Sequence, residues 1–430
     1  MTSEFRRTII LVLLVTIIVI VRYVANAQLT NMARIYNTGQ ISTNKVWAKS
    51  GYWRDIQAAV DAVDATGGGI VYIPEGTWNF VNVGESWTNA RVVVPAGVSI
   101  FGAPTQRDAN DQVIEWKTVL VLPWDMPSND SVGVRTWFRI GSEGASVNKF
   151  TRFSDIKFVG YRYYNNTAEH YYVGVRIQNI LDFRVDHCCF QDICGQGVTA
   201  SGSSVPGRPM IHYYIRGVVD HCIFNNTVGK VAPYDTRTVG YGVYVTRGGG
   251  YQYEDWETDA TKILGQYTNY TVYVEDCYFS KWRHCVVARQ GAHVIVRHST
   301  VEHDYAYGSI DIHGDESGRA VEIYNCTIID AVTGGQDGAA WIRGGAGVAF
   351  NNTVGGGRYN YFIQFSNENS NSTFWINYWY VWSNTMLNDC TEITEYDPNN
   401  QITEGVNYFR YAPSWYTSYP YPHPLTRLMP

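Results

Sequence analysis

The chain has 430 residues, of which 45% are hydrophobic and only 17% charged, and this composition excludes a protein that is disordered over most of its length. Its formal net charge of −6 argues against nucleic acid as a partner. Aromatic residues reach 15%, with 33 Tyr and 14 Trp, which suits either packed core rings or a surface on which sugar rings stack.

The first 27 residues have the pattern of a targeting segment. Arg6 and Arg7 precede an apolar run at 8–21, and a small-x-small cleavage candidate follows at 25–27. This order is typical of a secretory signal peptide. The alternative is an uncleaved anchor that tethers the protein to a membrane through residues 8–21, although a spanning helix usually needs about 20 apolar residues. In both cases we expect residues 28–430, which begin with a polar linker at 28–50, to be secreted or held at the cell surface.

Sequons for N-glycosylation are compatible with a glycoprotein in that compartment. They begin at Asn129, Asn165, Asn225, Asn269, Asn325, Asn351 and Asn371. Two of them, at 325 and 351, fall in a repeated phrase described below, where Asn also serves as a turn residue.

An amphipathic helix is predicted in the region 51–105, which we assign to a cap and a first coil. Ile56, Ala59, Val60 and Val63 recur at helical spacing. Glycines at 67–69 end the helix, and the apolar run at 70–73 indicates a strand.

A short phrase then recurs through the region 106–385. It is VDHCCF at 185–190, VDHCIF at 219–224, VEDCYF at 274–279, VRHSTV at 296–301, IYNCTI at 323–328 and AFNNTV at 349–354. The copies are 34, 55, 22, 27 and 26 residues apart, which is typical of a solenoid. The strands alternate with period two, so we predict a β-helix rather than stacked helices. The 55-residue step is either one coil with a long insertion or two coils.

The segment 53–80 resembles the N-terminal segment of the pectate lyase superfamily, in which an Ala-rich helix leads into GG-x-V-x-x-P-x-G-x-Y. Trp78 stands at the Tyr position. The resemblance implies an all-β fold, a right-handed parallel β-helix with an N-terminal capping helix. The aromatic tail at 386–430, with YPYPHPL at 419–425, is also similar to the tails of secreted β-helix proteins. The superfamily includes lyases, hydrolases, tailspikes and adhesins, and the chain lacks the motif set of the polygalacturonases, so function must be argued from a site.

The strand phase predicts a ladder of outward side chains on one sheet. In SIDIHGD at 309–315, for example, the isoleucines point inward, which leaves 311 and 313 outward. The predicted catalytic residues are His313, Arg289, Arg343 and Asp311. The predicted substrate-binding residues are Arg176, Tyr244, Trp341, Gln364, Asp315 and Glu316. Stacking rings and arginine forks suit an extracellular polysaccharide, and acidic glycans in particular.

Two chemistries fit this ladder. A lyase on acidic sugars needs a cation that stabilises the carboxylate and a base that takes the C5 proton, roles for Arg289 or Arg343 and for His313. A hydrolase needs two carboxylates, and Asp311 with Asp315 or Glu316 is the candidate pair. The alternative is a solvated face on which Asp311 pairs with the two arginines. A different class remains open, a non-enzymatic cell-surface, sheath or adhesin-type protein that self-assembles.

The eight cysteines suggest a core ladder rather than a metal centre. Cys188, Cys222, Cys277 and Cys326 share one repeat position, and we expect them to be buried thiols. Short bridges between 188 and 194 and between 277 and 285 are the alternative. No zinc spacing is present and no metal site is predicted, although the carboxylates of the acidic loop 254–259 are of the kind that binds Ca²⁺. The histidines at 187, 221 and 298 share a turn position and are predicted to be turn residues rather than ligands.

Overall fold

The computed structural model describes residues 44–82, 85, 90–122, 135–141, 147–160, 172–193, 195–202, 214–226, 240–247, 259–303, 308–314, 317–330, 337–357, 359–368 and 370–428. Residues 43–430 form one compact unit. The predicted signal peptide or anchor at 1–27, and most of the predicted linker, lie outside the described residues.

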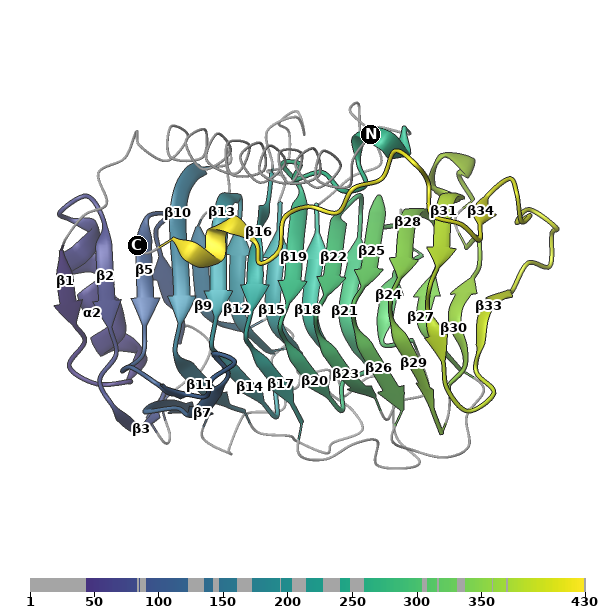
Figure 1. Ribbon diagram of the computed structural model, residues 1–430. Helices are drawn as coiled ribbons and strands as arrows, with labels where there is room; N and C mark the ends of the chain where they lie inside the picture. The colour runs from purple at the N-terminus through teal and green to yellow at the C-terminus, as the bar shows by residue number, and fades with distance from the viewer. Residues whose placement is uncertain are drawn as a thin grey trace, which may run out of the picture. The chain divides into compact units, whose positions relative to one another are not determined.

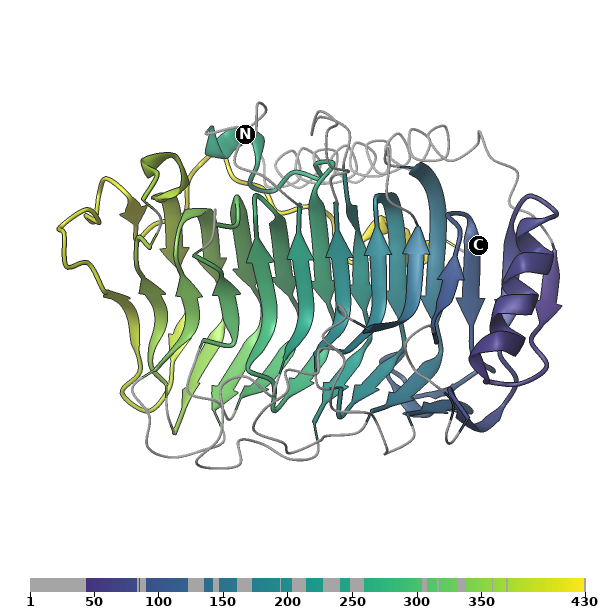
Figure 2. The same ribbon diagram turned by 180° about the vertical axis from the view of Figure 1, so that it is seen from behind.

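The protein is an all-β, right-handed parallel β-helix in which three parallel sheets wrap around one apolar core (Figure 1, Figure 2). Each coil contributes one strand to each sheet, so neighbours in a sheet come from successive coils. We name the sheets A, B and C and give their strands in order along the stack.

Sheet A contains β1 (Lys45–Trp47), β2 (Gly69–Tyr72), β5 (Val98–Phe101), β10 (Val147–Ser154), β13 (Ile180–Asp186), β16 (Arg216–Asp220), β19 (Thr271–Glu275), β22 (His293–Arg297), β25 (Ala320–Tyr324), β28 (Gly345–Phe350), β31 (Ile376–Trp382) and β34 (Tyr408–Phe409). Sheet B contains β3 (Gly76–Asn79), β8 (Thr118–Val121), β11 (Ile156–Val159), β14 (Cys189–Gln191), β17 (Ile223–Asn225), β20 (Tyr278–Ser280), β23 (Thr300–His303), β26 (Thr327–Asp330), β29 (Thr353–Gly356) and β32 (Thr385–Met386). Sheet C contains β4 (Val92–Val94), β9 (Arg135–Gly141), β12 (Tyr172–Gln178), β15 (Gln196–Ser201), β18 (Tyr241–Thr246), β21 (His284–Arg289), β24 (Ile310–Ile312), β27 (Asp337–Ile342), β30 (Tyr359–Phe365) and β33 (Thr391–Glu395).

Outside the three sheets, β6 (Gln106–Arg107) and β7 (Val113–Glu115) form an antiparallel hairpin. In the part of the chain that the structure describes, the helices are α2 (Trp53–Asp64) and three short 3-10 helices, η3 (Ala260–Lys262), η4 (Ser372–Phe374) and η5 (Pro424–Arg427). The predicted helix is confirmed: α2 lies at the first end of the stack beside β2 (Figure 1), and its apolar stripe is buried. It covers an apolar interior that an open solenoid end would expose.

The core repeats from coil to coil because equivalent residues are in register. Phe158, Phe190, Phe224 and Phe279 occupy one position of sheet B, and consecutive rings stack with centroids 5.0, 4.9 and 4.6 Å apart. The 55-residue step is one coil with a long insertion, because β16 pairs directly with β19.

The repeated phrase marks the turn between sheets A and B. Its turn residues are left-handed, with φ between 49° and 56°, and they are His187, His221, Asp276, His298, Asn325 and Asn351. The expectation that the three histidines are turn residues is confirmed. Asn, Asp and His adopt this conformation more readily than other residues with side chains.

The cysteines beside these turns are buried and free. The thiols of Cys222, Cys277 and Cys326 donate to the carbonyls of Val185, Val219 and Val296 in the coil before, at 3.6, 3.6 and 3.5 Å. The suggested short bridges are wrong, because neither Cys188 nor Cys277 forms a disulfide. A bridge between Cys277 and Cys285 does not form because Cys277 lies at the turn between sheets A and B, whereas Cys285 belongs to a strand of sheet C.

The last residues run back along the outer face of sheet A (Figure 1). In this tail segment (residues 411–428), the carbonyls of Tyr419 and Pro420 accept from Arg297 at 2.8 and 2.9 Å, and that of Thr426 accepts from Arg184 at 2.7 Å. The amide of His423 donates to Glu275 at 2.8 Å. The tail segment therefore contacts several coils at once.

Candidate functional site

The outward residues of sheet C form a row that crosses the stack at one register. We call this the central row, and it consists of Arg139, Arg176, Thr199, Tyr244, Val287, Asp311, Trp341, Gln364 and Thr394. The inward residues on either side, such as Val243 and Val245, are buried in the core. The predicted phase of these strands is confirmed.

A second row lies two residues further along each strand. We call this the outer row, and it consists of Gln178, Ser201, Thr246, Arg289, His313, Arg343 and Ser366. The predicted single ladder is thus wrong in one respect, because it divides into two rows. Val287 takes the position in the central row that the sequence had assigned to Arg289.

Asp311 and Arg343 join the two rows in a buried ion pair. Arg343 Nη2 lies 2.6 Å from both carboxylate oxygens of Asp311, and its Nη1 donates to Glu368 at 3.1 Å. The guanidinium lies over the ring of Trp341, 4.5 Å from its centroid. Two buried charges held this way satisfy each other's hydrogen bonds, as a buried pair requires.

The expectation that Asp311 faces solvent is wrong, since its exposed fraction is 0%. Burial opposes ionisation of this carboxyl, but the charge and hydrogen bonds of Arg343, and at acid pH the charge of protonated His284, outweigh burial and lower its pKa. A carboxyl with a lowered pKa stays ionised near neutral pH, so it holds no proton to donate. The geometry matches the ion-pair alternative for Asp311 and Arg343.

His284 packs beside this pair from the neighbouring coil. Its Nδ1 donates to the carbonyl of Gly308 at 2.5 Å, and its Nε2 lies 3.8 Å from Asp311 Oδ2. Burial lowers the pKa of His284 to about 4. The ring is therefore neutral at pH 7.

The half-buried part of the face consists of rings with polar groups beside them. Tyr241 and Tyr244 stack with centroids 5.5 Å apart, and Arg289 Nη1 donates to the Tyr244 hydroxyl at 3.4 Å. Trp341 Nε1 donates to Ser366 Oγ at 3.3 Å. Arg176, His313 and Gln364 are also half-buried. Rings that expose part of a face next to hydrogen-bonding groups can hold a sugar.

Some predicted residues cannot be placed. Asp315, Glu316 and most of the acidic loop 254–259 lie outside the described residues, and so do large parts of the inserts at 200–215 and 247–266 that the sequence suggested as groove walls.

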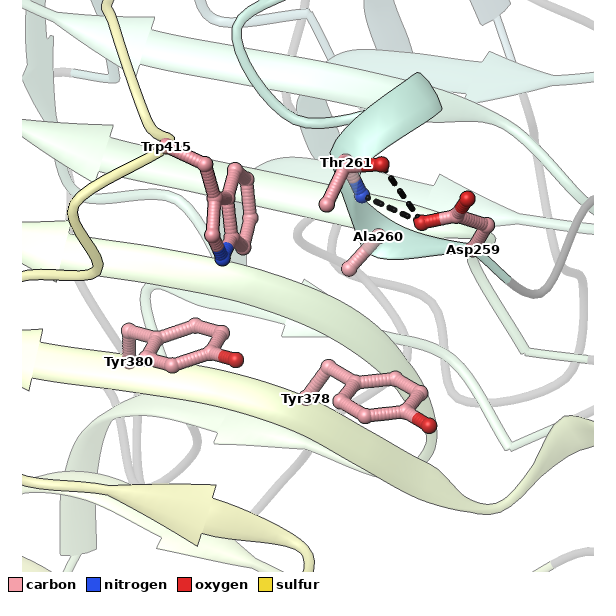
Figure 3. A pocket seen from close by; sticks show the side chains of 6 residues that line it. All are labelled: Asp259, Ala260, Thr261, Tyr378, Tyr380 and Trp415. Atoms are coloured by element: carbon pink, nitrogen blue, oxygen red, sulfur yellow. Dashed lines mark hydrogen bonds between the residues drawn. The ribbon is translucent and has the colours of Figure 1, made fainter.

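Sequence reasoning missed an aromatic pocket on the other side of the solenoid. Figure 3 shows it between β31, η3 and the tail segment. Its volume is about 370 Å³, and Asp259, Ala260, Thr261, Tyr378, Tyr380 and Trp415 line it. Trp415 meets Tyr380 edge-to-face with centroids 5.6 Å apart. Aromatic runs at 378–382 and 415–421 were visible in the sequence, but nothing local indicated that the chain end returns to β31.

Among the described residues, one group of side chains could hold a metal ion, and it consists of Asp111, His187 and His221. It lies at the A–B turns rather than on sheet C. None of the described helices is long and apolar enough to cross a membrane.

Comparison with known proteins identifies the fold. No protein-family model matches the sequence, and no curated protein matches it. A double mutant of the tailspike protein of E. coli bacteriophage HK620 is similar in structure, with a TM-score of 0.51 and 19% identity over 80% of this chain and 55% of the tailspike. A second structure, of a single mutant of that tailspike in complex with a pentasaccharide, gives a TM-score of 0.50 and 17% identity with the same coverage. The alginate lyase of Paenibacillus sp. is 12% identical, with a TM-score of 0.44 over 83% of this chain and 99% of the lyase.

The chain spans about half the length of the tailspike that it matches. At these identities the likeness establishes the parallel β-helix fold and nothing about activity.

Proposed function

We propose that this protein binds an extracellular polysaccharide on the outer face of sheet C, as a pectate lyase-like β-helix protein. The observation that carries the proposal is the placement of Tyr241, Tyr244 and Trp341. These half-buried rings stand on one face together with Arg176, Arg289 and Gln364.

The spacing of these groups suits a polymer that runs along the stack. Tyr244 and Trp341 lie on β18 and β27, three coils apart, which is about 14 Å at ~4.8 Å per strand. Between them, Arg289 offers a guanidinium that can bind a carboxylate with two hydrogen bonds. One of the similar tailspike structures is a complex with a pentasaccharide, which supports the proposal.

The binding test compares this face with the aromatic pocket. Tyr244→Ala and Trp341→Ala should each weaken binding to the best ligand of a polysaccharide panel by about tenfold or more, the effect of losing roughly 1.4 kcal/mol. Trp415→Ala is the matched control, because it removes a similar ring from the pocket in Figure 3. Loss of binding in Trp415→Ala alone would assign the ligand to the pocket and refute the proposal for sheet C.

We extend the proposal to a lyase that acts on acidic glycans. Arg289 and His313 are half-buried in neighbouring coils of the outer row. Arg289 would stabilise a uronate carboxylate, and His313 would take the C5 proton. The electron pair left at C5 forms the C4–C5 double bond, the C4–O bond breaks, and the departing oxygen takes a proton from solvent. Arg343 would position this face rather than bind substrate, because Asp311 and Glu368 already hold it.

The activity test incubates the protein with uronate polysaccharides and follows absorbance from unsaturated ends alongside reducing ends. Growing absorbance that His313→Ala and Arg289→Ala abolish would support the lyase, with Arg410→Ala as a surface control. Reducing ends without absorbance would indicate a hydrolase and refute the lyase. Binding without either product would leave the protein a carbohydrate-binding one.

A second candidate function is that of a non-enzymatic, self-assembling surface protein. Exposed apolar side chains gather in the last coils and the tail segment, including Tyr396, Val406 and Tyr411 at 65%, 62% and 55% exposure. Exposed apolar surface of this kind can mark a contact with another protein. Sedimentation velocity across a range of concentrations tests it, and a constant monomer would exclude assembly through this end.

A further inference from the structure

The A–B turns place two imidazole rings in consecutive coils next to each other. His187 and His221 share the left-handed turn conformation, and their rings stack with centroids 4.9 Å apart and 15° between planes. The amide of His187 donates to the carbonyl of Asp220, and that of His221 to the carbonyl of Glu275. The same turn geometry in both coils therefore fixes where each ring points.

A buried carboxylate orients each of these rings. His187 Nδ1 lies 2.6 Å from Asp186 Oδ2, and His221 Nδ1 lies 2.9 Å from Asp220 Oδ2. A carboxylate accepts hydrogen bonds, so each Nδ1 donates to its carboxylate. His187 Nε2 faces the backbone carbonyl and Oδ2 of Asp111 at 3.1 and 3.2 Å, and it would give up any proton it carries when it binds a metal ion. Histidines that bind metal ions usually donate their second ring nitrogen to a carboxylate in this way.

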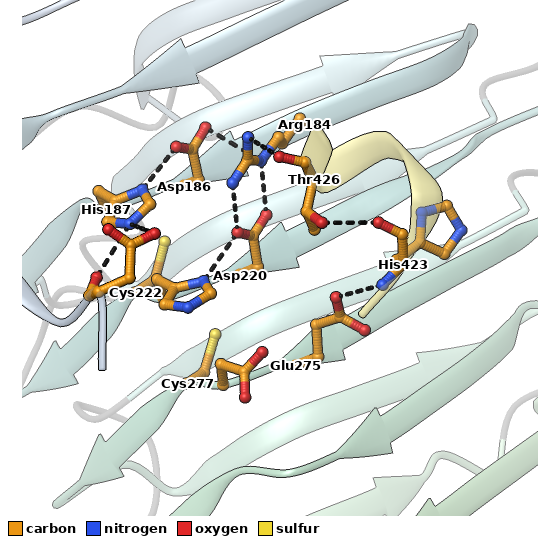
Figure 4. Close-up of polar contacts among 12 residues, drawn as sticks. Arg184, Asp186, His187, Asp220, Cys222, Glu275, Cys277, His423 and Thr426 are labelled. Carbon is orange, nitrogen blue, oxygen red and sulfur yellow. Dashed lines mark hydrogen bonds and ion pairs between the residues drawn. The ribbon is translucent and has the colours of Figure 1, made fainter. Parts of the chain in front are cut away.

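Arginines hold the two carboxylates in place. Figure 4 shows Asp186 and Asp220 on either side of Arg184, which donates to Asp220 at 2.9 and 2.7 Å. Arg152 donates to Asp186 at 2.7 and 2.6 Å. Each carboxylate is therefore held from behind by a guanidinium through two hydrogen bonds. The layer behind the rings is thus rigid and charge-balanced.

The β6–β7 hairpin brings a third potential metal ligand, a carboxylate, next to the two imidazole rings. Asp111, in its loop, places Oδ2 3.2 Å from His187 Nε2. The hairpin is fixed to the same row of turns, because Trp116 Nε1 donates to the carbonyl of His187 at 2.8 Å and Gln112 Nε2 to that of Asp276 at 3.2 Å. One ligand-type atom from each of Asp111, His187 and His221 lies within 4.8 Å of the others.

We propose that Asp111, His187 and His221 form a binding site for one divalent transition-metal ion such as Zn²⁺. Bonds of about 2.1 Å in a tetrahedral site separate the ligand atoms by about 3.4 Å, so the observed separations need only small side-chain movements. Two imidazole nitrogens and one carboxylate suit Zn²⁺ or Co²⁺ better than Ca²⁺. The fourth position faces solvent, because the Asp111 side chain is 55% exposed. The ion would fasten the hairpin to two coils of the solenoid.

The test titrates untagged full-length protein, first stripped with a chelator, with Zn²⁺ in a calorimeter and with Co²⁺ by visible absorbance. One equivalent should bind, with the absorbance of a tetrahedral Co²⁺ site. Asp111→Asn and His221→Gln should weaken binding by at least about tenfold. Asp111→Asn changes an exposed side chain and so leaves the fold intact, which a thermal melt of the stripped protein checks.

His298→Gln is the matched control, because His298 occupies the same turn position in a later coil and stacks on Tyr421 at 3.6 Å instead. It should bind Zn²⁺ as the unaltered protein does. The proposal is overturned if the unaltered protein binds neither ion, if Asp111→Asn and His221→Gln bind as tightly as it does, or if His298→Gln is weakened equally.

Discussion

At the scale of single residues, outward-facing side chains of this solenoid differ most in what covers them. Asp311 and Trp341 are neighbours in the central row, yet Asp311 is fully buried while Trp341 keeps part of its ring exposed. The difference comes from Arg343, whose guanidinium binds the carboxylate of Asp311 and packs against one face of the indole of Trp341. Strand alternation gives the direction of a side chain, but its exposure depends on its neighbours in other coils.

The Asp311–Arg343 pair should matter far more than a surface pair. Asp311→Ala leaves a buried guanidinium whose remaining acidic partner among the described residues is Glu368, and loss of one buried partner costs about 3–5 kcal/mol of unfolding free energy. Arg410→Ala breaks the exposed pair with Glu392 and should cost at most about 1 kcal/mol. Urea unfolding of both variants measures the difference, and equal midpoints would contradict the assignment.

Burial of His284 predicts a pH dependence of stability. Its pKa is about 4 in the folded protein because burial disfavours the charged ring, against about 6.5 when unfolded. Between these two pH values the unfolded chain therefore binds more protons than the folded protein. The contribution of His284 to the free energy of unfolding is complete above pH 6.5 and is lost as pH falls toward 4. The loss amounts to about 3 kcal/mol.

Thermal or urea unfolding from pH 7.5 to 4 tests this, with His284→Gln expected to show a shallower decline. The comparison with the variant is needed because Glu275 acts in the opposite sense. Burial raises the pKa of Glu275 to about 7, although the charge of Arg297 acts to lower it. The free energy of unfolding that Glu275 contributes is therefore lost as pH rises through 7. Parallel pH profiles for variant and unaltered protein would exclude His284 as a source.

At the scale of elements, the close fit of sheet C to the phenylalanine stack rests on one repeated glycine position. A β carbon on Gly197 would lie 2.8 Å from Phe224, and one on Gly242 would lie 2.6 Å from the carbonyl oxygen of Cys285 and 2.8 Å from Phe279. Both glycines follow the first residue of a sheet C strand, in consecutive coils. The aromatic column of sheet B thus selects the smallest residue in the strand opposite.

Gly242→Ala should destabilise the fold by about 1–3 kcal/mol, because the added methyl overpacks the core. Gly242→Ala combined with Phe279→Leu should recover part of that loss by making room. Denaturation midpoints of the two variants and of Phe279→Leu alone test the coupling. Strictly additive effects would show that the two positions do not contact each other.

The elements that repeat were predictable, and those that cross between repeats were not. The phrase around Cys188 and Cys222 predicted the turns, the buried thiols and the strand phase, because each depends on local alternation in every coil. The division of the ladder at Val287 and the burial of Asp311 depend on register between coils. The hairpin that carries Asp111, and the return of Trp415 to Tyr380, involve residues far apart in sequence, and no local pattern encodes such contacts.

At the scale of the whole solenoid, the tail segment links coils that do not touch one another. Each coil of a solenoid contacts only its neighbours, so stability is usually a sum of local terms and coils can unfold separately. Here the tail segment binds Arg184, Glu275, Arg297 and Glu322, which lie on four different strands of sheet A. It also covers a row of arginines and carboxylates that would otherwise meet water.

A chain that ends at Phe409 should therefore unfold at lower denaturant concentration and less cooperatively. Circular dichroism and tryptophan fluorescence should give transitions that no longer coincide. A chain that ends at Leu428 is the control, because it keeps every described contact of the tail segment. Coincident transitions in the shorter chain would show that cooperativity comes from the coils alone.

The same tail segment fixes how many coils the protein can have. Solenoids commonly change length by gain or loss of repeats, since each repeat needs only its neighbours. Deleting one coil between β13 and β25 would shift the partners of Tyr416 and Thr426 by ~4.8 Å relative to each other, and a tail of constant length would miss one of them. Coil number and tail length must change together, so an engineered or evolved variant with another coil count would need a new tail of matching length.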